Sequence, residues 1–163
     1  MTAFDPLRAL RTLDAHGVRF VVIGGVAAAA HGSPSVTQDL DVCPERTPDN
    51  LERLAAALVS LHARLRGIDE DVPFLLDART LDAGDHFTFI TDAGDLDVLG
   101  TPAGTGGYDD LVTDAVVVDL DELSVRVATI EGLIRMKRAA GRPKDRVELE
   151  ILGALRREHL GDG

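Results

Sequence analysis

The sequence predicts an α/β domain of the α+β kind, with a mixed, partly antiparallel sheet, helices against one face and a helical C-terminal tail. Residues 20–23 form a β-branched, aromatic run typical of a buried strand, and the first strand is expected over 19–23. Residues 86–99 alternate polar and apolar side chains around an Asp-Ala-Gly turn, which predicts a β-hairpin. Two further short strands are expected over 115–119 and 124–128. From residue 130, apolar side chains recur at three- and four-residue steps, as on a helix.

Length and composition indicate one domain. The chain has 163 residues, 45% of them hydrophobic, which suffices for a full core. We predict a single domain over 1–163, with a sheet-bearing core over 1–128 and C-terminal helices over 129–163. No run approaches the roughly 20 apolar residues of a membrane span, and the first five residues lack a basic signal region. We therefore expect a soluble cytoplasmic protein. The single cysteine, Cys43, excludes an internal disulfide and a cysteine-cluster zinc site.

Two helices have clear start signals. Asp5 before Pro6 is typical of a helix cap, and this first helix is expected to stop at Gly17. A similar signal opens the stretch 47–65, whose leucines recur at helical spacing and belong to the core. Residues 67–85 are acidic and irregular, which favours a solvated connection.

The stretch from residue 20 to residue 43 carries the strongest chemical signal. Strand alternation places Asp39 and Asp41 on one face. Two carboxylates about 4 Å apart repel by about 4 kcal/mol near a protein surface, and a bound Mg²⁺ would reverse that sign. Gly24 and Gly25 allow backbone N–H groups to approach an anion, and the helix that follows adds its positive end. This arrangement predicts a nucleoside triphosphate site in which a metal bridges phosphates to the acids.

A third carboxylate comes from the hairpin. Asp-Leu-Asp-Val occurs at 39–42 and again at 95–98. If the apolar residues of the second copy face the core, Asp97 points toward the face of the first acidic pair, and Asp95 sits at the hairpin mouth. Three carboxylates suit a two-metal transfer site, in which the third also takes a proton from the attacking hydroxyl. The alternative is two ordinary acidic strand ends.

The last signal lies in the C-terminal helices. Lys137 continues the apolar stripe that starts at Ile130, so it lies on the inward face and must snorkel or meet an anion. Lys144 and Asp145 follow at the start of the closing helix, whose positive end Asp145 would suit. In the functional interpretation, Lys137 touches the triphosphate while Lys144 and Asp145 order the site.

Charge is unevenly distributed. The net charge of −11 argues against a broad nucleic-acid footprint. Residues 124–163 nevertheless carry a net charge of about +3 and the rest about −14, counted from the formal charges. This suits a polyanion that bridges metal-bearing acids and a cationic lid. Solvation of the last helices by lysine and arginine is the simpler alternative.

Taken together, these motifs resemble the nucleotidyltransferase superfamily of the DNA polymerase β type. There a Gly-Gly or Gly-Ser pair opens a helix and an Asp-x-Asp pair follows on the next strand. The lysine and the later Lys-Asp pair resemble the last two motifs of abortive-infection type toxin nucleotidyltransferases and small bacterial relatives. The resemblance covers nearly the whole chain. It implies Mg²⁺- or Mn²⁺-dependent transfer of a nucleoside monophosphate from an NTP to an acceptor hydroxyl, with release of pyrophosphate.

The resemblance also implies roles and partners. A toxin-like role would bring an antitoxin-like protein partner, and no membrane partner is expected. The acceptor is a small molecule, a protein side chain or a tRNA end. Two rivals stay open: a nucleotide- or partner-binding module without turnover, and a metal-dependent nuclease, which leaves the glycines and the inward lysine unexplained. The catalytic and metal residues are Asp39, Asp41 and Asp97, and the nucleotide- or phosphate-binding residues are Gly24, Gly25, Lys137, Lys144 and Asp145.

Overall fold

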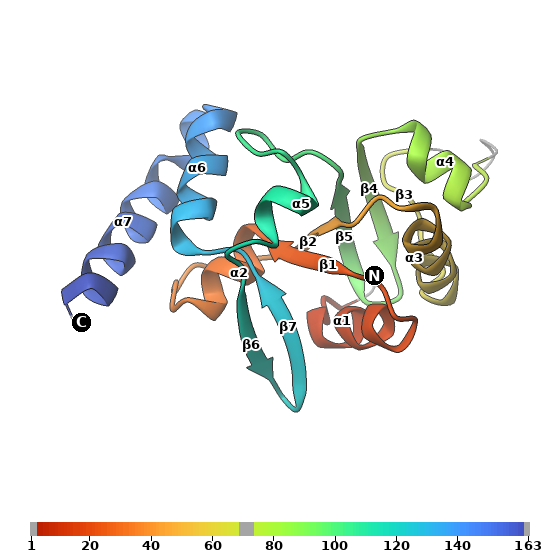
Figure 1. The fold of residues 1–163 in the computed structure, drawn as a ribbon, viewed down its shortest axis with the longest axis horizontal. Helices are drawn as coiled ribbons and strands as arrows, with labels where there is room; N and C mark the ends of the chain where they lie inside the picture. Colours follow the sequence, from red (N-terminus) through yellow and green to blue (C-terminus); the bar gives the residue numbers. More distant parts are fainter. Residues whose placement is uncertain (1–2, 69–73, 162–163) are drawn as a thin grey trace.

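The computed structural model describes residues 3–68 and 74–161. They form a seven-stranded sheet that lies between two groups of helices (Figure 1). The strands are β1 (Phe20–Ile23), β2 (Asp39–Pro44), β3 (Arg64–Leu65), β4 (His86–Thr91), β5 (Gly94–Leu99), β6 (Val116–Leu120) and β7 (Leu123–Val127). The helices are α1 (Pro6–Ala15), α2 (Gly24–Ala30), α3 (Pro48–Ser60), α4 (Ala78–Ala83), α5 (Tyr108–Leu111), α6 (Ile130–Ala140) and α7 (Arg146–Gly161), with a 3-10 turn, η1 (Pro143–Asp145), before α7.

The sheet is mixed, as the sequence predicts. Its strand order is β3-β4-β5-β2-β1-β7-β6. The β2–β5 and β1–β7 pairs are parallel, and the other four pairs are antiparallel. The predicted hairpin of β4 and β5 and the two short strands β6 and β7 are all present. Because β2 and β5 are parallel, their two copies of Asp-Leu-Asp-Val lie in register, residue against residue.

At β2 and β5, the apolar core covers one face of the sheet. Leu40 and Val42 of β2 are buried, as are Leu96 and Val98 of β5, because alternate residues of a strand point to the same side. The leucines of α3 and α4 pack beside Val98, and α1 contacts α3. The C-terminal tail lies apart from these helices, with α6 packed on α7 at the other end of the molecule (Figure 1).

Helix boundaries follow the predicted caps. The Asp5 carboxylate accepts a hydrogen bond from the Arg8 N–H, and α1 ends before Gly17, which has a φ of +72°. The predicted helix over 47–65 is too long, however. It ends at Ser60, because His62 adopts a left-handed φ of 52°, and Leu65 instead pairs with β4 in the short strand β3.

The connection over 67–85 is more ordered than predicted. Asp77 caps α4 by accepting a hydrogen bond from the Thr80 N–H, and Leu81 of this helix is buried in the core. The sequence did not predict this helix, because Leu81 is its one buried residue and a single apolar side chain makes no helical pattern. The acidic residues within 69–73 lie outside the described residues. Within the described ranges, none of the helices has the length and apolar character needed to cross a membrane.

A buried asparagine fastens α3 to the sheet. The Asn50 Oδ1 accepts a hydrogen bond from the Arg19 N–H at 2.8 Å, and its Nδ2 donates to the carbonyls of Arg19 at 2.9 Å and Glu45 at 2.7 Å. These groups belong to the entry of β1 and the exit of β2. The start of α3 is therefore fixed relative to the two strands that lead into the cavity described below.

Replacing this side chain should destabilise the fold. We expect Asn50→Ala to lower the free energy of unfolding by about 3 kcal/mol, because it leaves buried backbone groups without partners. Urea denaturation followed by circular dichroism measures this change. Glu52→Ala, an exposed position in the same helix, is the control and should change stability by less than about 0.5 kcal/mol. Equal stability of the two variants would contradict the structural role of Asn50.

Candidate active site

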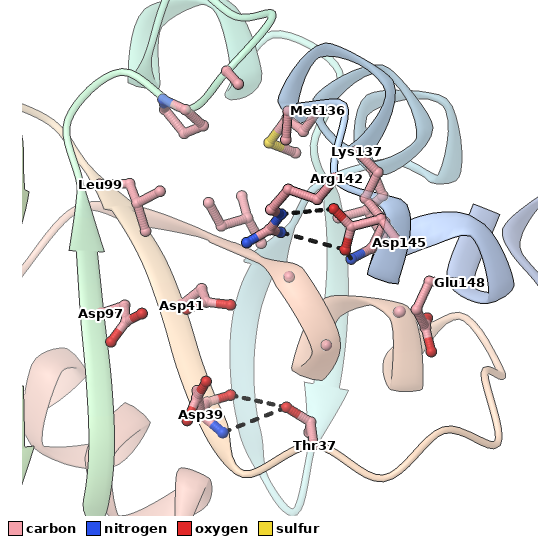
Figure 2. Close-up of a pocket in the computed structure, with 18 of the residues that line it drawn as sticks. Thr37, Asp39, Asp41, Asp97, Leu99, Met136, Lys137, Arg142, Asp145 and Glu148 are labelled. Atoms are coloured by element: carbon pink, nitrogen blue, oxygen red, sulfur yellow. Dashed lines mark hydrogen bonds and ion pairs between the residues drawn. The ribbon is translucent and has the colours of Figure 1, made fainter. Parts of the chain in front are cut away.

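A cavity of about 420 Å³ lies between the sheet and the C-terminal helices (Figure 2). All eight site residues predicted from the sequence line it. They come from separate elements: Gly24 and Gly25 from the start of α2, Asp39 and Asp41 from β2, Asp97 from β5, Lys137 from α6, and Lys144 and Asp145 from η1. Segments more than 100 residues apart in the chain thus meet at one cavity.

The acidic wall is a product of strand register. Asp39 of β2 lies opposite Asp95 of β5, and Asp41 lies opposite Asp97. The residues between them are buried in the core, so all four carboxylates point to the other face of the sheet, which we call the acid face. Figure 2 shows three of them, Asp39, Asp41 and Asp97, on neighbouring strands at the cavity. Asp95 belongs to this face as well, rather than only to the hairpin mouth.

Asp41 is the least compensated of these acids. Burial, followed by the charges of Asp97 and Asp39, raises the pKa of Asp41 to about 7, and the charges of Lys137 and Arg66 oppose this rise only in part. Within residues 3–68 and 74–161, the Asp41 carboxylate has no hydrogen bond or ion pair. Burial also raises the pKa of Asp97, with Arg66 acting against it and Asp39 adding to it.

The start of α2 is pressed against the acid face. Gly24 has a φ of 69°, and a side chain there would clash with the Asp41 carboxylate. A Cβ on Gly25 would lie 2.6 Å from the Thr37 Oγ1. Both positions therefore require glycine for steric reasons, and they keep the backbone of this turn open toward the cavity.

The opposite wall is cationic. The buried Asp145 accepts the Lys137 Nζ at 3.3 Å and the Arg142 Nε at 2.7 Å. Burial opposes ionisation of Asp145, but the hydrogen bonds and charges of Arg142 and Lys137 outweigh it and lower the pKa of this carboxyl. Asp145 lies just before α7, and its carboxylate also holds two cationic side chains at the cavity. Arg142 was not predicted from the sequence, although its position three residues before Asp145 was a usable signal.

Arg66 is the second residue that sequence analysis missed. Its Nη1 lies 2.9 Å from the Asp95 Oδ2 and 4.0 Å from the Asp39 Oδ1, and its Nη2 lies 2.9 Å from the Asp97 Oδ1. His86 lies 3.9 Å from the other oxygen of Asp97 and also lines the cavity. No local pattern marks Arg66, because its contacts depend on strand pairings distant in sequence.

The acid face suits a divalent cation by its chemistry. Carboxylate oxygens are the ligands that Mg²⁺ prefers, and the Asp41 carboxylate lies among other acids without an ion pair to any described residue. The spacing differs from a finished site, however. In the described part of the chain, no group of three or more His, Cys, Asp or Glu side chains is close enough together to hold a metal ion. As the structure stands, the counter-charge of Asp97 is Arg66.

Comparisons with known proteins agree on the fold. No protein-family model matches the chain, and no curated protein does. Among solved structures, a Thermotoga maritima protein assigned as a nucleotidyltransferase, TM1012, aligns with 100% of this chain and 98% of its own, with a TM-score of 0.58 at 16% identity. The chain has the nucleotidyltransferase fold.

The antibiotic-resistance factor ANT(2'')-Ia shares this nucleotidyltransferase fold. Its solution structure aligns with 96% of this chain and 90% of its own, with a TM-score of 0.57 at 14% identity. Its crystal structure in complex with adenylyl-2''-tobramycin covers 93% of this chain and 94% of its own, with a TM-score of 0.50 at 16% identity. Alignments that span nearly both chains confirm the fold predicted from the sequence. The chemistry has to be argued from the cavity.

The raised pKa of Asp41 predicts a pH-dependent stability. Its folded-state pKa of about 7 lies above the ordinary value of 3.8, so the folded chain binds this proton more tightly than the unfolded chain does. The stabilisation is complete at low pH and is lost as the pH rises through about 7. Asp41→Asn should therefore stabilise the metal-free chain at pH 8 by about 2 kcal/mol, with little difference at pH 4.

Denaturant unfolding in the presence of a chelator at both pH values measures this difference. Asp114→Asn removes an exposed carboxylate outside the cavity and should change stability little at either pH. A destabilised Asp41→Asn at pH 8 would contradict the electrostatic account.

Proposed function

We propose that the protein is a Mg²⁺- or Mn²⁺-dependent nucleotidyltransferase. It transfers a nucleoside monophosphate from an NTP to an acceptor hydroxyl and releases pyrophosphate. The observation that carries the proposal is the opposition of charge across one cavity: carboxylates of β2 and β5 on one wall, and Lys137, Arg142 and Lys144 on the other. A metal-bound triphosphate matches both walls, because its cation meets the acids and its phosphates meet the basic side chains.

Each residue has a role in this proposal. Asp39, Asp41 and Asp97 would hold the metal, which when bound neutralises charge on the triphosphate. The acceptor oxygen attacks the α-phosphorus, the bond to pyrophosphate breaks, and Asp97 takes the hydroxyl proton. The reaction depends mainly on positioning and charge neutralisation.

Phosphate binding falls to the other walls of the cavity. Gly24 and Gly25 line the cavity and would direct backbone N–H groups to the phosphates, which Lys137 would contact from α6. Asp145 orders this wall through its ion pairs with Lys137 and Arg142, and Lys144 adds charge beside it. An inward lysine already held by a buried carboxylate keeps its ammonium group in place before the nucleotide arrives.

A nucleotide- or partner-binding module without turnover is the second candidate. The pairing of Arg66 with Asp97 favours it, since this pairing occupies a carboxylate that transfer chemistry would use. Calorimetry and a pyrophosphate assay separate the two functions. Saturable NTP binding without pyrophosphate release, on every acceptor tried, would support the module.

The acceptor is open to direct identification. Small molecules, protein side chains and tRNA ends all present hydroxyls, and the net charge of −11 disfavours a long duplex. Incubation with each labelled NTP and a cell lysate reveals which molecule becomes labelled. Because the ANT(2'')-Ia crystal structure contains adenylyl-2''-tobramycin, tobramycin belongs among the purified acceptors.

The toxin-like role remains part of the proposal. Induced expression of the chain should then arrest growth in a bacterial host, and an antitoxin-like protein partner should relieve the arrest. An Asp41→Asn variant expressed at the same level provides the control. Arrest by both forms would argue against a toxin that acts through nucleotidyl transfer.

Loss of one acid should strongly reduce labelling. We expect Asp41→Asn to reduce NTP-dependent labelling of the acceptor by on the order of 100-fold, the size typical of losing one electrostatic group of a transition state. Labelling per folded protein at saturating Mg²⁺ measures this loss. Asp114→Asn carries the same chemical change outside the cavity and should label normally. Unchanged labelling by Asp41→Asn would refute its metal role.

A further inference from the structure

We propose that Arg66 is a built-in counter-cation of the acid face, which a divalent ion must displace from Asp97. The inference rests on the proposed function, because it takes the acid face as the metal site. Arg66 reaches three of the four carboxylates, with its two terminal nitrogens 2.9 Å from Asp95 and Asp97 and 4.0 Å from Asp39. One guanidinium thus bridges carboxylates of β2 and β5.

The backbone places Arg66 in this position. Its N–H donates to the Thr88 carbonyl at 2.9 Å, which continues the pairing of β3 with β4 by one residue. Thr88 lies opposite Asp97 on β5, and Asp97 lies opposite Asp41 on β2. Arg66, Thr88, Asp97 and Asp41 therefore form one row across the sheet. Residues in such a row point to the same face, so the guanidinium is delivered to the acids by register.

The same row explains why the carboxylates are not gathered into a metal site. The Asp97 Oδ1 accepts the Arg66 Nη2, which turns this oxygen toward the arginine. Arg66 carries its charge at every physiological pH, so it repels a divalent ion from the same oxygens. Within the described ranges, no three ligating side chains converge. Binding of the ion by Asp97 and release of Arg66 are therefore linked.

Arg66 has a consequence for the metal-free protein as well. The acid face joins two parallel strands at the centre of the sheet, so its repulsion acts directly on the β2–β5 pair. Arg66 relieves that repulsion when no metal is bound and opposes metal binding for the same reason. Arg66 is therefore a positioning residue that sets the affinity of the acid face for a divalent ion.

Metal binding without nucleotide tests this inference. Mn²⁺ is titrated by calorimetry into the wild-type chain, Arg66→Gln and Arg79→Gln. Arg79→Gln removes an equal charge from an exposed site that does not line the cavity. We expect Arg66→Gln to bind Mn²⁺ about 10-fold more tightly or better, because the competing cation is gone, and Arg79→Gln to bind like the wild type. Arg66→Lys, which keeps the charge but loses the fork, should bind with intermediate affinity.

Thermal unfolding provides a second measurement. The midpoint of Arg66→Gln should be lower than that of the wild type in chelator and should rise more on addition of Mn²⁺. Should this variant be unfolded without metal, recovery of its fold with Mn²⁺ would support the inference, and failure to recover would overturn it.

The outcomes separate the two proposals. Equal Mn²⁺ affinity in the wild type and Arg66→Gln overturns the competition while the proposed transferase stands. Absence of saturable Mn²⁺ binding in both proteins, measured with and without NTP, overturns the metal role of the acid face and the competition with it.

Discussion

Electrostatic crowding on the acid face is the constraint on which the rest of the structure depends. Parallel pairing of β2 and β5 sets Asp39 beside Asp95 and Asp41 beside Asp97. The register cannot slip by one residue, because that would exchange buried apolar side chains such as Leu40 with the acids. The hydrophobic core therefore fixes the positions of four like charges, and the remaining chain has to accommodate them.

The negative charge of the acid face is only partly neutralised by nearby cations. Arg66 pairs with Asp97 and Asp95 at one side of the acid face. On the opposite wall, Lys137 and Arg142 form ion pairs with Asp145. Asp41 lies between the two groups with a raised pKa. A site with a partly neutralised acid face and a pre-ordered basic wall suits a ligand that brings both signs of charge, as a metal-bound triphosphate does.

Local sequence predicted the parts of the site that depend on local geometry. Alternation along single strands was enough to place Asp39 and Asp41 on one face, and a hairpin signal brought Asp97 to the same cavity. Local spacing gave a wrong helix end. Leu65 continues the leucine spacing of α3, but the helix ends at Ser60 and Leu65 lies in a strand. The role of Arg66 could not be predicted for another reason. Its role follows from pairings between distant strands, and a sequence carries no short pattern for those.

A Mg²⁺ titration followed by nuclear magnetic resonance is the most direct test of the central claim, that the acids of β2 and β5 form one cation site beside the turn at α2. With the uniformly ¹⁵N-labelled protein, the amide signals of Gly24, Asp41 and Asp97 should shift together and yield one dissociation constant. Signals of the β6–β7 hairpin should stay in place. Changes that do not saturate, or that fall outside the cavity, would contradict the account.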